Sequence, residues 1–160
     1  MLTQSDLHEL FNFSNGILIC KKPTNTKIKI GDFVGSLHIE GYLKTKIYKK
    51  EYLLHRLIFM WNYGYLPKYI DHINGIKTDN RIENLRPATN SQNCQNSKKR
   101  LTNTSGYKNV FWRKDRQKWT VLVSVNNKLK SFGCFDNLEL ADLVAQEARE
   151  KYHKEFARHL

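Results

Sequence analysis

The sequence lacks any long apolar segment and has few cysteines. No hydrophobic run approaches the roughly 18–20 residues that cross a bilayer, and no basic leader followed by an apolar stretch opens the chain. We therefore expect no membrane partner and a cytoplasmic location. Cys20, Cys94 and Cys134 are odd in number and far apart, which favours reduced, buried thiols over a disulfide framework or a cysteine-rich zinc site.

Acidic residues are also scarce. The 160 residues include 27 Lys and Arg against 15 Asp and Glu, for a net charge of +12. Such an excess indicates an acidic partner, either nucleic acid or an anionic membrane surface. Between Lys98 and Lys130 the chain holds ten basic residues and a single acidic one, Asp115. This concentration favours nucleic acid over an ordinary solvated face.

The chain has enough apolar residues for one modest domain or two small ones. Residues 1–50 contain short strand-like segments separated by glycines. Leu54, Leu57, Ile58 and Trp61 follow at helical spacing, and Gly64 ends this pattern. We therefore predict an α+β fold whose N-terminal antiparallel strands precede a buried helix.

The middle of the chain, "IDHINGIKTDNRIENLRPATNSQNCQN" from residue 70 to 96, is rich in asparagine and poor in core-forming residues. We predict a short strand, a loop of turn formers, a second strand and a helix with Thr89 or Asn90 as N-cap. Asp71 and His72 are adjacent at the end of the predicted first strand, where successive side chains point in different directions. One of them can therefore hold a metal while the other faces a water molecule.

These residue types suit phosphodiester hydrolysis. An imidazole with an ordinary pKa of about 6.5 can accept a proton from water at neutral pH. A hard divalent cation, held by a carboxylate, an amide oxygen and the phosphate itself, can stabilise the leaving oxygen. The polar middle segment therefore predicts a hydrolytic site.

The stretch "DHINGIKTDNRIENLRPATNSQN" resembles the HNH endonuclease motif, in the variant whose last histidine is replaced by asparagine. The longer stretch "LLHRLIFMWNYGYLPKYIDHINGIKTDNRIENLR" is similar to small phage-encoded and intron-encoded HNH nucleases of the homing type. The resemblance implies a ββα-metal fold with its core motif in residues 52–97 of a nuclease domain 1–97. It also implies a phage or mobile element acting in a bacterial cytoplasm.

The same resemblance implies a role for four residues. His72 would be the general base and Asp71 a metal ligand. Asn84 would hold the loop and orient His72, and Asn93 would be the second metal ligand. The expected ion is divalent, Mg²⁺, with Mn²⁺ able to substitute.

The last third of the chain is similar to an AP2 DNA-binding domain. The resemblance lies in "GYKNVFW", in "KW" at the start of the second strand, in "GCF" before an acidic helix start, and in "EFA" near the end. It implies a three-stranded antiparallel sheet packed on one helix, with the sheet in the DNA major groove. Residues 105–160 would form this module, joined by a basic linker, residues 98–104. The chain departs from the family at Asn109 and Lys154, where glycine is common.

Candidate DNA contacts come from the basic residues of both parts. Arg86 belongs to the second strand of the motif and is a candidate contact with the DNA backbone. Arg56 belongs to a His55–Arg56 pair on the predicted helix. This pair fits a role in supporting the site or contacting a phosphate, and it fits an ordinary helix surface equally well. We place Trp119 on the helix side of the predicted sheet because it alternates with valines. The remaining candidates are Lys98, Lys99, Arg100, Lys108, Trp112, Arg113, Lys114, Arg116, Lys118, Lys128 and Lys130.

Together these patterns predict a metal-dependent, site-directed DNA endonuclease that cuts one strand per active site. Cutting both strands of double-stranded DNA would need a homodimer or a second binding event. Two alternatives remain open: a non-catalytic, sequence-specific DNA-binding regulator, and a nuclease that acts on RNA.

Overall fold

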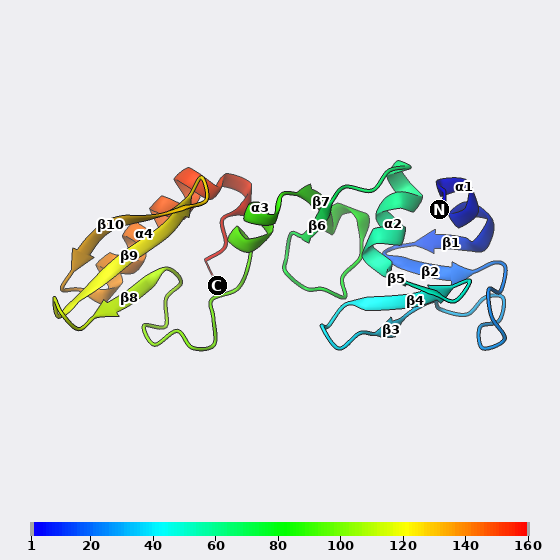
Figure 1. The fold of residues 1–160 in the computed structure, drawn as a ribbon, viewed down its shortest axis with the longest axis horizontal. Helices are drawn as coiled ribbons and strands as arrows, with labels where there is room; N and C mark the ends of the chain where they lie inside the picture. Colours follow the sequence, from blue (N-terminus) through cyan, green and yellow to red (C-terminus); the bar gives the residue numbers. More distant parts are fainter. Residues whose placement is uncertain (1, 160) are drawn as a thin grey trace. The chain divides into compact units, whose positions relative to one another are not determined.

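A computed structural model describes residues 2–159, which form two compact units with a boundary between Ala88 and Thr89 (Figure 1). The sequence predicts a first domain that extends to residue 97. In the structure, helix α3 (Asn90–Gln95) is instead grouped with the second unit. One physical reason is Lys108, whose Nζ donates hydrogen bonds to the carbonyl oxygens of Gln95 and Ser97 at 2.8 and 2.6 Å.

The first unit surrounds helix α2 with short strands. Its elements before the polar middle are α1 (Gln4–Leu10), β1 (Phe11–Ser14), β2 (Ile17–Cys20), β3 (Ser36–Leu37), β4 (Leu43–Ile47), β5 (Lys50–Leu53) and α2 (Leu54–Tyr63). β1 and β2 form one hairpin, and β3, β4 and β5 form a second antiparallel sheet. The N-terminal helix α1 is absent from the sequence prediction, which has only strands in this region. A capping box between Thr3 and Asp6 starts it.

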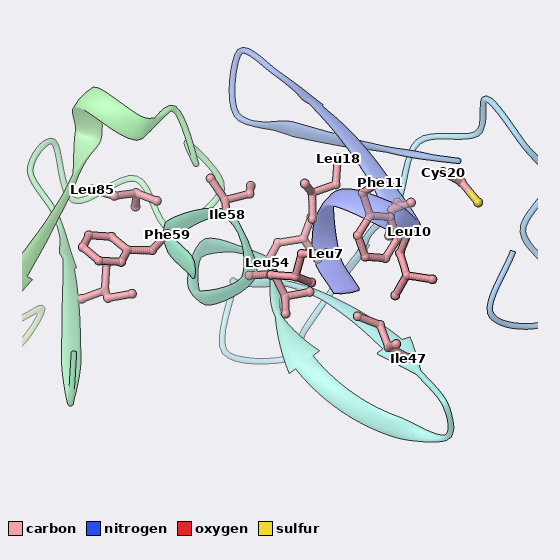
Figure 2. Packing of buried hydrophobic residues seen from close by; sticks show 13 residues of the cluster. Leu7, Leu10, Phe11, Leu18, Cys20, Ile47, Leu54, Ile58, Phe59 and Leu85 are labelled. Atoms are coloured by element: carbon pink, nitrogen blue, oxygen red, sulfur yellow. The ribbon is translucent and has the colours of Figure 1, made fainter. Parts of the chain in front are cut away.

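Helix α2 is the main element of the first core. Leu54, Leu57 and Ile58 are buried, as their spacing predicts, and Gly64 ends the helix with a left-handed φ of 75°. Figure 2 shows side chains from α1, α2 and the strands gathered in this cluster. Its buried members are Leu7, Leu10, Phe11, Leu18, Cys20, Val34, Ile47, Leu54, Leu57, Ile58, Phe59, Ile70 and Leu85.

The polar middle forms an antiparallel hairpin of β6 (Tyr69–His72) and β7 (Leu85–Ala88), with a 3₁₀ turn at Ile82–Asn84 before β7. The buried Ile70 and Leu85 attach this hairpin to the core. Helix α3 follows with Thr89 as its N-cap. The element order β6, β7, α3 therefore matches the predicted strand–strand–helix sequence.

The second unit contains a three-stranded antiparallel sheet and one long helix. The strands are β8 (Val110–Arg113), β9 (Lys118–Val125) and β10 (Lys128–Phe135), in the order β10-β9-β8, and the helix is α4 (Leu138–His153). Its buried core is Val110, Val121, Val123, Ala141, Ala145 and Ala148. This arrangement of strands and helix agrees with the prediction. The N-cap of α4 is Asn137.

Asn109 and Lys154 adopt the positive-φ backbone conformation that glycine favours. Their φ angles are 69° and 52°, both in the left-handed region. Asparagine tolerates this region better than most residues, whereas lysine does not. A short 3₁₀ turn, Lys154–Phe156, follows α4. None of the helices within residues 2–159 is long and apolar enough to span a membrane.

Candidate active site

Strand β6 ends in two buried polar side chains, Asp71 and His72, which are 4% and 5% exposed. The hairpin register places Asp71 opposite Arg86 and His72 opposite Leu85. Because successive residues of a strand point to opposite faces, the carboxylate and the imidazole have different surroundings. A buried carboxylate and a buried imidazole therefore adjoin at one strand end, as the sequence predicts.

Arg86 contacts Asp71 across the hairpin. Its Nε and Nη2 lie 2.9 and 2.8 Å from the same carboxylate oxygen, Oδ2. The sequence predicts that Arg86 contacts the DNA backbone, but the register directs it to Asp71. A guanidinium at this distance fixes the orientation of the carboxylate.

His72 is held by Asn80, a residue that the sequence does not single out. The His72 Nε2 lies 3.1 Å from Asn80 Oδ1, and Asn80 is only 2% exposed. Asn84, which is expected to hold the loop and orient His72, accepts a hydrogen bond from the Asn74 amide and donates one to the Asp79 carbonyl. Asn84 thus bridges two points of the loop, while Asn80 contacts the imidazole.

Two further rings surround His72. The ring centroids of His55 and His72 are 5.1 Å apart, and Tyr42 lies 5.1 Å from His55 and 6.0 Å from His72. Burial lowers the pKa of His72, against the opposing effects of Asn80, Asp71 and Asp79. Burial, assisted by the neighbouring His72 and Arg56, lowers the pKa of His55 to about 3. Both imidazoles are therefore neutral at pH 7, the form in which His72 can accept a proton.

The loop between β6 and β7 has its own support. Arg81 donates to both carboxylate oxygens of Asp79 at 2.9 and 2.8 Å, and Asn74 Nδ2 donates to Asp79 at 2.7 Å. These contacts, those of Arg81 above all, lower the pKa of Asp79. The left-handed Gly16 of the β1–β2 turn approaches the Asn80–Arg81 backbone so closely that a Cβ there would lie 2.6 Å from the Arg81 nitrogen.

Two other predicted site residues are Arg56 and Asn93. Arg56 donates from Nη1 and Nη2 to the carbonyls of Lys68 and Pro67, so it braces the segment before β6. Asn93 lies on α3, within the second unit. A capping box between Thr89 and Gln92 starts that helix.

The predicted DNA contacts of the sheet lie on both of its faces. Trp112 is paired with Trp119, and Lys128 and Lys130 are paired with Val125 and Val123. Directly paired residues share a face of the sheet, and Val123 belongs to the core that packs against α4. Trp112, Lys128 and Lys130 therefore lie on the face that α4 covers. Among the predicted contacts within the strands, Arg113 and Lys118 lie on the opposite, open face, where they form exposed ion pairs with Asp115 and Asp136.

Lys108 is turned inward, which corrects the expectation that it faces DNA. It is buried, and two carbonyl oxygens accept hydrogen bonds from its Nζ. Burial, with Arg149 and Arg158 nearby, lowers its pKa to about 8. Of the cysteines, Cys20 is buried as expected, whereas Cys94 is exposed and Cys134 is half-buried.

The side chains around His72 suit a hard divalent ion to which the protein supplies only one or two oxygen ligands. No cluster of three or more His, Cys, Asp or Glu side chains occurs within residues 2–159. A closed zinc site of such ligands is therefore absent from this part of the chain. Mg²⁺ commonly binds one or two protein oxygens and takes its other ligands from water and substrate phosphate. The buried carboxylate of Asp71 fits that pattern.

Comparison with known proteins agrees with this geometry. Residues 52–95 match the HNH endonuclease family model. The chain is 37% identical over 118 residues to "Protein 3.8" of Escherichia phage T7, an alignment that covers 71% of this chain and 97% of that protein. No solved structure shows significant similarity. The chain therefore belongs to the same family as Protein 3.8 and carries an HNH endonuclease domain, which makes it a nuclease by family.

Proposed function

We propose that this protein is a metal-dependent, site-directed DNA endonuclease of the homing type, with His72 as its general base. The observation that carries the proposal is the pairing of a buried, neutral His72 with the adjacent carboxylate of Asp71, within the segment that matches the HNH model. Neutral imidazole is the form that takes a proton from water at pH 7.

His72 accepts the proton of a water molecule whose oxygen attacks the phosphorus of a DNA phosphodiester. The bond from phosphorus to the 3′ oxygen breaks, and that oxygen departs. Asn80 keeps the imidazole in place through its contact with Nε2, and Asn84 keeps the loop closed around it. Asp71 and Asn93 would hold Mg²⁺, or Mn²⁺ in its place, which when bound neutralises negative charge on the phosphate and leaving oxygen.

The second unit supplies DNA binding. Arg113 and Lys118 stand on the open face of the sheet, and Lys114 and Arg116 lie in the turn between their strands. Ion pairs as exposed as those with Asp115 and Asp136 are worth little, so phosphates can replace the carboxylates. With one such site per chain, a break in both strands requires a homodimer on DNA or two binding events.

Nicking of supercoiled plasmid in Mg²⁺ tests the catalytic proposal. Wild-type protein should convert the plasmid to open circles, and His72→Ala should lower the rate by about 10²–10⁴-fold while DNA binding remains. His8→Ala is the matched control, because His8 is an exposed histidine of the same unit. Cleavage by His72→Ala at the wild-type rate would refute the assignment of the base.

The two alternatives give different results in the same assay. Binding without nicking by the wild-type protein would identify a regulator, and preferential cleavage of an RNA competitor would identify an RNA nuclease. For the second unit, Arg113→Ala with Lys118→Ala should reduce the slope of log affinity against log salt by about 1.8, at about 0.9 for each phosphate that the protein no longer neutralises. An unchanged slope would exclude the open sheet face as a phosphate-binding surface.

A further inference from the structure

The second unit contains a basic hollow of about 1050 Å³ that reaches the sheet at Phe111, Trp112 and Ser124, and Arg113 and Lys118 are not among its lining residues. Lys98, Lys99 and Arg100 line it, together with amide and hydroxyl groups such as those of Asn103 and Thr104. No acidic side chain is among its lining residues. The sequence continues this bias, because no acidic residue stands between Glu83 and Asp115. The hollow therefore offers cations and neutral donors to an anionic partner.

Leu101 interrupts the lining of the hollow. Residues 98–100 and 102–104 all line it, whereas Leu101 does not and is fully exposed to solvent. Three cations stand directly before this leucine in the chain. Leu101 thus adds a fully exposed apolar side chain beside the basic hollow, whose own lining includes the partly exposed Phe111 and Trp112.

Hydrogen bonds hold the segment around Leu101 in place. The Asn103 amide donates to the Arg100 carbonyl at 3.0 Å, which closes a turn with Leu101 and Thr102 at its tip. The Asn103 side-chain oxygen accepts from the Gly106 amide at 2.8 Å, and Lys99 Nζ donates to the Gly106 carbonyl at 2.6 Å. The leucine is therefore presented by an ordered turn, so little conformational freedom remains to be lost on binding.

We propose that the hollow binds the phosphate backbone of double-stranded DNA and that Leu101 enters the adjacent minor groove as a wedge between base pairs. Proteins that bend DNA from the minor groove insert leucine and similar side chains in this way, next to arginine and lysine that neutralise the phosphates. The proposal rests on the proposed function only in taking DNA as the partner. It assigns to the segment between the catalytic motif and the sheet a role in deforming the substrate.

The charge around Leu101 distinguishes DNA from an apolar protein pocket as the partner. Burying one leucine side chain gains about 1.5–3 kcal/mol, which alone corresponds to millimolar binding or weaker. An apolar pocket would also require Lys98 and Arg100 to lie against uncharged surface. Double-stranded DNA provides both a partner for the cations and a site for the leucine, because its phosphates lie on either side of a groove whose base is formed by the base edges.

A topoisomerase assay tests the wedge without any cleavage. Relaxed plasmid is incubated with the full-length protein in EDTA, together with a topoisomerase that needs no metal ion, and the topoisomers are separated after protein removal. A wedge that unstacks base pairs unwinds the duplex, so wild-type protein should shift the topoisomer distribution. Leu101→Ala should bind about tenfold more weakly and, at saturating protein, should give no shift.

Leu143→Ala is the matched control, because Leu143, on helix α4, is another exposed leucine of the same unit. It should retain both binding and the shift. Lys98→Ala with Arg100→Ala should weaken binding and its salt dependence, yet retain the shift at saturation. A wild-type shift in Leu101→Ala, or plasmid binding by the wild-type protein without any shift, would overturn the proposal. Nicking in Mg²⁺ is measured separately, so failure of the wedge and failure of catalysis remain distinct.

Discussion

Gly16→Ala should damage both stability and activity, because this glycine lies against the backbone of the residue that holds the general base. Its φ is +81°, where an alanine costs about 1–2 kcal/mol. The added Cβ would also lie 2.6 Å from the Arg81 nitrogen and 2.8 Å from the Asn80 carbonyl carbon, well inside the 3.4 Å at which ordinary contact begins. Such crowding typically costs a further 1–3 kcal/mol or so. We therefore expect a total loss of about 2–5 kcal/mol.

Gly31→Ala separates the two contributions. Gly31 has a similar φ of +89°, but no atom lies within 4 Å of its would-be Cβ. Urea unfolding should therefore show a loss of only about 1–2 kcal/mol for this control. Plasmid nicking by the folded proteins provides the second measurement.

Displacement of the Asn80 backbone should lower the nicking rate of Gly16→Ala by about tenfold to a hundredfold, whereas Gly31→Ala should cut like the wild type. Equal unfolding free energies for the two variants would refute the proposed contact between the β1–β2 turn and the loop. Normal nicking by a folded Gly16→Ala would refute its importance for His72.

Three further changes test other parts of the structure. Asn80→Ala removes the His72 contact and should lower kcat by about tenfold without raising KM for plasmid. The pKa of His55 is about 3 in the folded protein and 6.5 unfolded, so the unfolded chain binds the extra proton between these values and stability should fall as the pH drops below about 6.5. His55→Phe should remove up to about 1.4 kcal/mol per pH unit from the pH dependence of the unfolding free energy, measured with urea. If His55→Phe leaves this pH dependence unchanged, the buried imidazole is not its source. Lys154→Gly should raise the free energy of unfolding by about 1 kcal/mol, because φ is 52° there; a loss of stability would show that the Lys154 side chain matters more than its backbone.

The elements best predicted from the sequence are those whose apolar residues recur at a clear helical or strand spacing. Leu54, Leu57 and Ile58 mark α2, and alternation along Trp119, Val121 and Val123 marks the middle strand of the second sheet. Helix α1 has only seven residues, too few for a persuasive helical period. Its capping box of Thr3 and Asp6 is the signal that could have indicated it.

The DNA-facing residues are harder to predict, because charge alone does not fix the register of a strand. Asn126 and Asn127 both adopt positive φ, 51° and 61°, and form a tight two-residue turn between β9 and β10. That turn pairs Lys128 with Val125 and therefore sets Lys130 on the face covered by α4, where its Nζ lies 5.9 Å from the Tyr152 ring centroid. A shift of one residue would have placed both lysines on the open face.

The asparagines of the polar middle segment explain why its composition is so unlike a core. The loop between β6 and β7 has little regular structure, so its buried backbone groups need side-chain partners. Asn74 accepts from the Ile76 amide, and Asn84 satisfies the Asn74 amide near the start of the loop and the Asp79 carbonyl in its middle. Amides do this without adding charge beside His72, whereas carboxylates in the same places would raise its pKa and favour the protonated form that cannot act as a base. Motif spacing could indicate that asparagines belong here, but only the folded loop shows that Asn80, and not Asn84, contacts the imidazole.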